Sequence, residues 1–126
     1  MKILSIIPIR AGSKRLKNKN LLKLNGKPLV NHILDKLVSI QEITKIIIST
    51  DYKNLNNSIL NNSRKVVIEK RDKKLATDKS TALDVVKSII KKHPNYDIYS
   101  YHLVTCPLIP RADLLKGIRM VKKKNI

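Results

Sequence analysis

Near its amino terminus the chain reads ILSIIPIRAGSKRLKNKN over residues 3–20, an apolar run that passes directly into a basic segment with one glycine. Residues 3–7, which are rich in β-branched isoleucine and are followed by Pro8, predict a short buried strand that ends at the proline. The polar residues 9–20 predict a loop. A buried strand that leads into such a loop is typical of the first unit of an α/β domain, in which ligands bind beyond the carboxyl ends of the strands.

Outward from this unit, apolar strands and amphipathic helices alternate along the chain. Asn25-Gly26 predicts a turn, and Pro28 suits the first turn of a helix. We expect further strands at 45–49, 66–68 and 98–104, and helices at 28–40, at 52–61, from about 83 to before Pro94, and at 111–122. This order predicts a parallel sheet covered on both faces by helices. The loops that follow the carboxyl ends of the strands, where the site is expected, are residues 8–20, 69–82 and 105–111.

The composition is that of one domain with an aliphatic core. The 126 residues include no Trp and no Phe, and the 42% hydrophobic share argues against a wholly disordered chain. The longest apolar run, residues 3–9, is far shorter than the roughly 20 residues that cross a membrane, and it lacks a secretory cleavage pattern. The single cysteine, Cys106, excludes an internal disulfide. We therefore expect a cytoplasmic protein that forms one domain over residues 1–126 and binds no membrane.

The charge is strongly positive and unevenly distributed. The 27 Lys and Arg against 9 Asp and Glu give a net charge of +18, and no acidic residue precedes Asp35. Such a local field favours a polyanion or a phosphorylated small molecule. Part of the excess positive charge has an alternative explanation in genome composition. Lysine is read from codons rich in A and T, and 21 of the basic residues are Lys. Nucleic acid is not the expected ligand, because no aromatic residue near the basic cluster is placed to stack on bases.

The loop at residues 9–20 has the groups that a triphosphate requires. Gly12 lets the backbone approach a ligand closely, successive N–H groups form an anion-binding concavity, and Ser13 adds a hydroxyl. Arg10 and Lys19 place positive charge beside phosphate oxygens. The spacing matches neither the Walker A loop nor the dinucleotide fingerprint with its three glycines. From the residues alone, a solvated basic loop is the alternative interpretation.

Several segments, in order, carry a resemblance to a known family. They read IIPIRAGSKR at 6–15, KNL at 19–21, NGKPL at 25–29, IISTD at 47–51, R at 71 with LATD at 75–78, and TCPL at 105–108. Together they resemble the acylneuraminate cytidylyltransferases, which are the CMP-sialic acid synthetases and their relatives. The resemblance covers nearly the whole chain but only the nucleotide-binding half of the family's fold. We therefore expect a truncated product, a split gene or a fragment, possessing little or no activity alone.

The resemblance implies a Rossmann-like, three-layer nucleotidyltransferase fold with a mostly parallel sheet, truncated at the C-terminal side. It implies an enzyme that uses CTP, Mg²⁺ and a sialic acid-like sugar acid, whose anomeric hydroxyl attacks the α-phosphate to give a CMP-sugar and pyrophosphate. The complete protein would be a homodimer, and the metal ligands of the family match no residue here. By matching position, Arg10 and Lys19 would be catalytic, stabilising charge on the phosphates. The nucleotide-binding residues would be Pro8, Arg10, Gly12, Ser13, Lys19, Asn20, Arg71 and Thr81.

The chain departs from the family after its fourth expected strand. Leu103 stands where the family has a glutamine, and Ile109 stands where it has an arginine, with Arg111 two residues on as a candidate substitute. Asp51 is interpreted mainly as a cap for the next helix and secondarily as a Mg²⁺ ligand. Two alternative functions stay open. One is a related nucleotidyltransferase for 3-deoxy-manno-octulosonate or a sugar 1-phosphate, and the other is a non-catalytic basic module for RNA or another polyanion.

Overall fold

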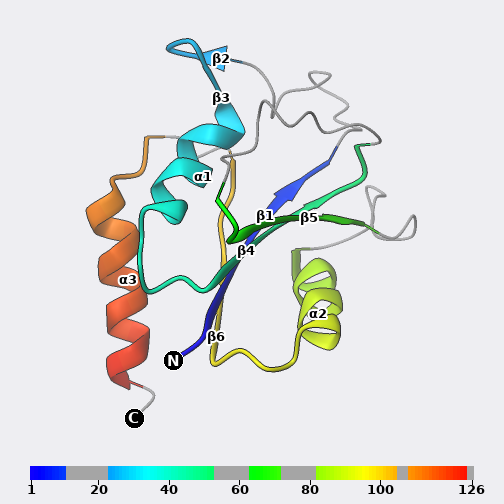
Figure 1. The fold of residues 1–126 in the computed structure, drawn as a ribbon, viewed down its shortest axis with the longest axis vertical. Coiled ribbons are helices and arrows are strands. Elements are labelled where there is room, and N and C mark those ends of the chain that lie inside the picture. The colour runs from blue at the N-terminus through cyan, green and yellow to red at the C-terminus, as the bar shows by residue number, and fades with distance from the viewer. Residues whose placement is uncertain (11–22, 53–62, 72–81, 105–107, 125–126) are drawn as a thin grey trace.

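A parallel sheet of four strands forms the centre of the molecule (Figure 1). The computed structural model describes residues 1–10, 23–52, 63–71, 82–104 and 108–124. In the order of the sheet the strands are β5 (Val66–Lys70), β4 (Lys45–Thr50), β1 (Ile3–Ile9) and β6 (Ile98–Tyr101), and each adjacent pair is parallel. Along the chain, β4 and then β5 add to one side of β1, and β6 adds to its other side. This arrangement confirms the predicted α/β architecture.

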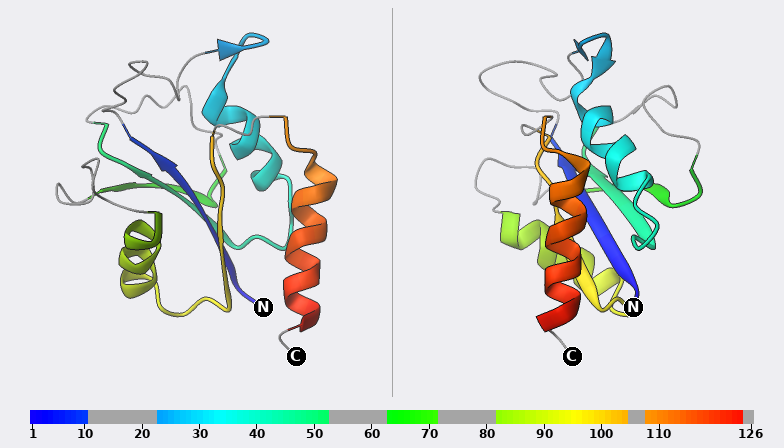
Figure 2. Two further views of the ribbon diagram at one scale, coloured as in Figure 1. Left: turned by 180° about the vertical axis from the view of Figure 1, so that it is seen from behind. Right: turned by 90° about the vertical axis from the view of Figure 1, so that its left-hand side faces the viewer.

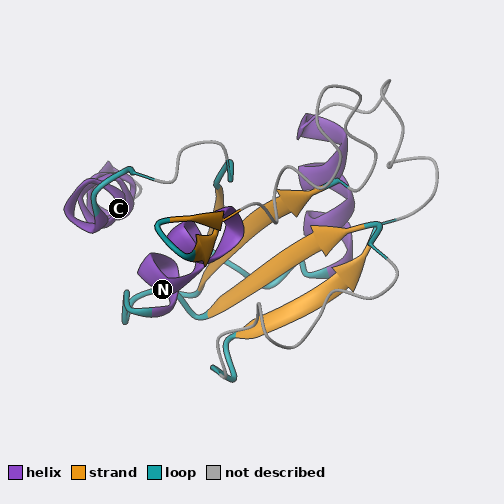
Figure 3. Cartoon of the chain, turned by 90° about the horizontal axis from the view of Figure 1, so that it is seen from above, coloured by secondary structure: helices purple, strands orange, loops and turns teal. Residues whose placement is uncertain are grey.

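Helices cover both faces of this sheet. One face packs against α1 (Leu29–Val38) and α3 (Arg111–Lys124), and the other packs against α2 (Ala82–Lys92). The views in Figures 2 and 3 show α2 on the side of the strands opposite α1, with α3 farthest from α2. None of the helices in the described part of the chain is long and apolar enough to cross a membrane.

The alternation of side chains along β1 divides the core in two. Ile3, Ile7 and Ile9 belong to the larger cluster with α1 and α3, whereas Leu4 and Ile6 belong to the cluster with α2. Because successive strand residues point to opposite faces, a strand that is buried on both faces must be apolar throughout, as β1 nearly is. The fully buried side chains of the core are Ile, Leu and Val, as the composition predicts.

The predicted turn at Asn25-Gly26 is present and joins a short hairpin, β2 (Lys23–Leu24) and β3 (Lys27–Pro28), directly before α1. Asn25 and Gly26 have φ angles of 53° and 76°. Positive φ at both central positions is the geometry that an Asn-Gly pair favours in two-residue hairpins.

The prediction that the first strand ends at Pro8 is wrong, since β1 continues to Ile9 and Pro8 pairs with Ser49 of β4. The carbonyl of Ile6 accepts a bond from the N–H of His102, so the main-chain groups of Ile6, and by alternation those of Pro8, face the β6 side. The last residue pair between β1 and β6 is Ile6 with Tyr101. Pro8 has no N–H to donate, but at this position no hydrogen bond to β6 is required, so the proline does not disrupt the sheet.

The other boundaries differ from the predictions by a few residues. The fourth strand, β6, ends at Tyr101 rather than at residue 104, and α1 ends at Val38. The last helix continues to Lys124. The helix that the sequence predicts at 52–61 lies almost wholly outside the described residues.

Candidate functional site

Two arginines and an aspartate follow the carboxyl ends of three adjacent strands. In the register of the sheet Pro8 lies opposite Ser49, and Ser49 lies opposite Glu69. The residues two positions further along are Arg10, Asp51 and Arg71. Because side chains alternate between faces along a strand, these three are on the face that α2 covers, at one level of the sheet. We call Arg10, Asp51 and Arg71 the strand-end row; it has the charge order plus, minus, plus.

Arg71 is the best defined member of this row. Its N–H donates to the carbonyl of Thr50 at 2.7 Å, which continues the pairing of β4 with β5 by one step. Its Nη2 donates to the carbonyl of Ser49 at 3.3 Å, so the guanidinium lies across the end of β4. Burial lowers the pKa of Arg71 from its usual value; the charge of Arg10 acts in the same direction, while Asp51 opposes it. The charges of both Asp51 and Arg10 thus act on Arg71, and the row as a whole carries one net positive charge.

Below the row, a tyrosine that the sequence analysis did not select faces the same side of the sheet. Tyr101 ends β6 opposite Ile6 and packs against the α2 cluster. Burial raises the pKa of the Tyr101 phenol, and the positive charge of Arg71 opposes this rise. At the level of the sheet between Tyr101 and the row lie Pro8, Ser49 and Glu69. A ligand at this edge of the sheet would therefore meet a phenol and two guanidinium groups, with the carboxylate of Asp51 among them.

A second polar group lies on the opposite face of β6. The Oγ atoms of Ser5 and Ser100 are 2.7 Å apart, and Nε2 of His102 is 2.8 Å from Ser100 Oγ. Burial lowers the pKa of His102 to about 4, so its imidazole is neutral near pH 7. The sequence did contain a sign of this polar group. Ser100 and His102 are two residues apart, and residues at that spacing in a strand lie on the same face of the sheet.

The sequence-predicted site residues divide into two sets. The structure brings Pro8, Arg10 and Arg71 to the carboxyl edge of the sheet, on one face. The other predicted residues lie outside the described part of the chain: Gly12, Ser13, Lys19, Asn20 and Thr81. Their positions in the site stay predictions.

Arg111 does not substitute for the family arginine at this edge. Its Nε donates to Ser39 Oγ at 2.7 Å, and its Nη2 donates to the Ser39 carbonyl at 2.9 Å. Ser39 is the C-cap residue of α1, so Arg111 joins the start of α3 to the end of α1. The guanidinium is occupied in packing two helices and is not available to a ligand of the strand-end row.

Comparison with known proteins identifies what this arrangement is similar to. A family model described as cytidylyltransferase matches residues 4–126. The chain is 28% identical over 119 residues to the N-acylneuraminate cytidylyltransferase of Escherichia coli O18:K1:H7, covering 94% of this chain and 28% of that protein. It is 31% identical over 120 residues to the pseudaminic acid cytidylyltransferase of Campylobacter jejuni, covering 92% of this chain and 51% of that protein.

A third relative, the CMP-N,N'-diacetyllegionaminic acid synthase of Legionella pneumophila, is 35% identical over 99 residues, which are 79% of this chain and 42% of that protein. Among solved structures, a CMP:2-keto-3-deoxy-manno-octonic acid synthetase complexed with CTP superposes with a TM-score of 0.72 at 24% identity. The match covers 94% of this chain and 48% of that one. This likeness establishes the fold. The chain spans about half, or less, of the length of the proteins it matches.

Proposed function

Because the chain belongs to the cytidylyltransferase family, we propose that it binds CTP at the strand-end row and serves the transfer of CMP to a sialic acid-like sugar acid. The observation that carries this proposal is the placement of Arg10 and Arg71 on either side of Asp51, at the ends of adjacent parallel strands. Planar guanidinium groups bind phosphate oxygens through paired, charge-assisted hydrogen bonds. Gly12 and Ser13, which are part of the predicted site, follow Arg10 closely in the sequence.

The relatives support the substrate class. Their names specify N-acylneuraminate, pseudaminic acid and N,N'-diacetyllegionaminic acid. In the proposed reaction the sugar hydroxyl oxygen forms a bond to the α-phosphorus of CTP. The bond from that phosphorus to the bridging oxygen of the β-phosphate breaks, pyrophosphate leaves, and the hydroxyl proton passes to solvent. Phosphoryl transfer of this kind depends on positioning and on neutralising the charge of the phosphates.

In this proposal the chain's own cations supply that neutralisation. Arg10 and Lys19 act on the α-phosphate and on the departing pyrophosphate, and Arg71 contacts the nucleotide. The remaining proposed contacts to CTP come from Pro8, Gly12, Ser13, Asn20 and Thr81. Tyr101, whose pKa the charge of Arg71 influences, adds a phenol on the same face of the sheet.

Mg²⁺, which the family resemblance implies, finds no site of its own in the described residues. No group of three or more His, Cys, Asp or Glu side chains gathers in that part of the chain. The strand-end row contributes one carboxylate, Asp51. Magnesium in proteins is commonly held by one or two carboxylates together with substrate phosphates and waters. The one carboxylate of the row, Asp51, would hold the ion only together with the phosphates of CTP, and the metal would add to the neutralisation of their charge. The roles proposed above rest on the chain's own residues.

Titration calorimetry with CTP tests nucleotide binding. Replacing Arg10 by Gln removes a charge-assisted contact worth about 1.5–3 kcal/mol, so we expect CTP affinity to fall about ten-fold to a hundred-fold. The matched control is Lys70→Gln, which removes the same charge from an exposed residue one position before Arg71. The control should leave the affinity within about two-fold, since exposed single charges contribute little. Equal effects of the two substitutions would refute a specific phosphate site.

Two further measurements separate the competing functions. Titration with UTP, GTP and ATP in place of CTP tests the preference for cytosine, and a nucleotidyltransferase of another specificity would prefer one of these. An RNA-binding module would instead bind oligonucleotides with an affinity that falls steeply as salt rises, and both substitutions would weaken it alike. Pyrophosphate release with CTP, Mg²⁺ and sialic, pseudaminic or legionaminic acid tests turnover. We expect it to be slow or absent for these 126 residues, and robust turnover would refute that part of the proposal.

A further inference from the structure

Tyr101 is held in place from both sides at the end of β6. Its neighbours Ser100 and His102 lie on the opposite face of the sheet, where Ser100 Oγ is 2.7 Å from Ser5 Oγ and 2.8 Å from Nε2 of His102. The N–H of His102 donates to the Ile6 carbonyl of β1 at 2.9 Å. Because side chains alternate along a strand, the phenol between these neighbours faces α2 and packs against the α2 cluster. The sheet therefore fixes the position from which the phenol projects.

The Arg71 guanidinium extends across the end of β4, away from its own strand. The N–H of Arg71 donates to the Thr50 carbonyl, which therefore points toward β5. Main-chain groups alternate in direction along a strand, so the Ser49 carbonyl points the other way, toward β1. This is the carbonyl to which Arg71 Nη2 donates at 3.3 Å. The guanidinium thus reaches the side of β4 on which β1 and β6 lie.

The side chains of Tyr101 and Arg71 act on each other electrostatically. Burial raises the pKa of the Tyr101 phenol, and the charge of Arg71 opposes this rise. Burial lowers the pKa of Arg71, and negative charge on Asp51 and on an ionised Tyr101 opposes that fall. Tyr96 and Tyr99 pack against the same cluster and contact each other, with their ring centres 6.1 Å apart. Tyr101 thus links the α2 cluster to the strand-end row.

We propose that Tyr101 is a positioning residue of the nucleotide site, whose phenol holds the Arg71 guanidinium in the orientation that binds the nucleotide. This role rests on the proposed binding of CTP. A guanidinium has only hydrogen-bond donors, so the negative end of a phenol dipole stabilises it. A long side chain otherwise loses rotamer freedom when it binds a ligand. Held by the Ser49 carbonyl and the phenol together, Arg71 meets the nucleotide with part of that entropy already lost.

An NMR titration of the 126-residue chain with CTP tests this role, because it measures weak as well as strong affinities. Tyr101→Phe keeps the ring and removes the hydroxyl, and we expect CTP affinity to fall about three-fold to ten-fold. If the phenol acts through Arg71, its loss matters only while Arg71 is present. In the Arg71→Gln background, Tyr101→Phe should therefore change the affinity by less than about two-fold. Additive effects of the two substitutions would overturn the positioning role and show that Tyr101 contacts the nucleotide independently.

Two NMR signals of the chain without ligand report the same interaction. The side-chain Nε–H signal of Arg71 should shift in Tyr101→Phe, and the ring Cζ signal of Tyr101 should shift in Arg71→Gln. A tyrosine that served packing alone would leave both signals in place, since Phe retains the ring and Arg71 would not be its partner. The absence of either shift would overturn the positioning role, whether or not CTP binds.

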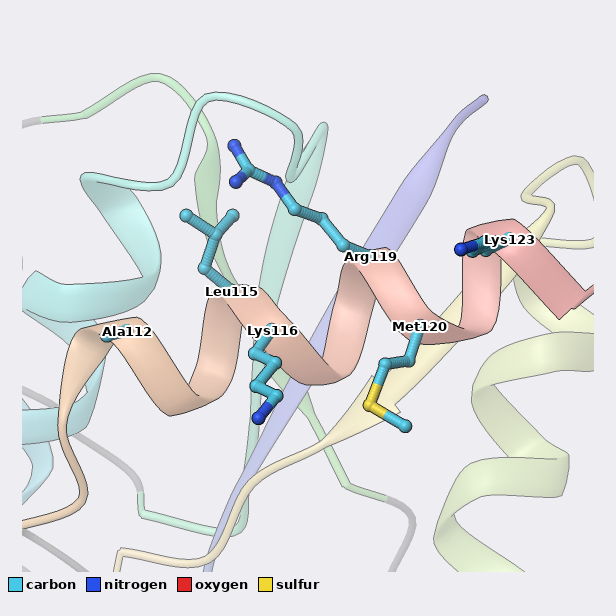
Figure 4. Close-up of a pocket in the computed structure, with 6 residues that line it drawn as sticks. All are labelled: Ala112, Leu115, Lys116, Arg119, Met120 and Lys123. Carbon is cyan, nitrogen blue, oxygen red and sulfur yellow. The ribbon is translucent and has the colours of Figure 1, made fainter.

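Two control variants match the two substitutions. Tyr96→Phe removes a hydroxyl from the same cluster, and Lys116→Gln removes a positive charge from α3, on the opposite face of the sheet. Lys116 is exposed and lines a hollow of about 370 Å³ on that helix (Figure 4). Both variants should leave the CTP affinity within about two-fold and the two signals unmoved. Equal effects of Tyr96→Phe and Tyr101→Phe would contradict the role given to Tyr101.

Circular dichroism establishes that each variant is folded. The outcomes also separate this role from the proposed function. A wild-type chain that does not bind CTP refutes the nucleotide site, and the positioning role with it. A wild-type chain that binds CTP, with an affinity that Tyr101→Phe leaves unchanged, refutes the positioning role alone.

Discussion

Replacing His102 by Gln should remove a large part of the chain's sensitivity to mild acid. His102 follows β6, with its Nε2 atom 2.8 Å from Ser100 Oγ, and burial lowers its pKa from 6.5 to about 4. In the unfolded chain the same imidazole binds a proton near pH 6.5. As pH falls through the window from about 6.5 to about 4, the unfolded state therefore gains a proton that the folded state does not, and stability is lost. Above this window His102 is neutral in both states and contributes no pH dependence.

The size of the effect follows from the two pKa values. Between about pH 7 and about pH 5, proton linkage with these values costs the wild-type fold about 2 kcal/mol. Gln keeps a polar side chain that can bond to Ser100 and does not titrate. Urea unfolding followed by circular dichroism, repeated at several pH values, measures the free energy of unfolding of each protein. The wild type should lose about 2 kcal/mol more than His102→Gln over this interval.

The control for this experiment is His32→Gln, which removes another histidine that bonds to the main chain, at the Leu24 carbonyl. This variant retains His102 and should keep the acid sensitivity that His102 contributes. If wild type and His102→Gln lose the same free energy of unfolding between the two pH values, burial does not hold the His102 imidazole neutral.

Three further substitutions test the fold by urea unfolding. Leu34→Ala empties a fully buried position between α1 and the sheet and should cost about 2–5 kcal/mol, so a loss below about 1 kcal/mol would contradict the packing described. Gly26→Ala should cost about 1 kcal/mol through its φ of 76° alone, because an added Cβ meets no atom within 4 Å; a much larger loss would mean that the hairpin is more crowded than described. Lys65→Met removes an ammonium that donates to the carbonyls of Val38 at 3.2 Å and Ile40 at 2.9 Å and should cost about 1–2 kcal/mol; an unchanged midpoint would show that water replaces both bonds.

Local patterns were sufficient to predict the fold class and most of its elements. Runs such as Ile46-Ile47-Ile48 and the helical spacing of Leu34 and Leu37 depend only on neighbours in the chain, and the structure confirms a strand and a helix there. The family resemblance rests on ordered local segments in the same way. Boundaries were less accurate, because the end of a strand depends on what lies beside it. Pro8 is tolerated within β1 because the ladder to β6 has already ended.

The site shows the same division. Arg10 and Arg71 were selected from the sequence, since each lies in a recognisable local motif. That they lie on one face with Asp51 between them follows from the register of three strands that are distant in sequence. Tyr101 and His102 were not selected, because a tyrosine and a histidine near a strand end have no distinctive spacing. Burial, which depends on the packing of the whole domain, raises the pKa of one and lowers that of the other.

The amino-acid sequence alone thus specified an aliphatic α/β domain and a family and predicted an anion-binding segment, because all three depend on residues that are close in the chain. Tertiary structure alone decided which charges meet and which side chains lose their contact with water. Those properties depend on strand order and on distances between segments that lie many residues apart, and no local pattern contains them.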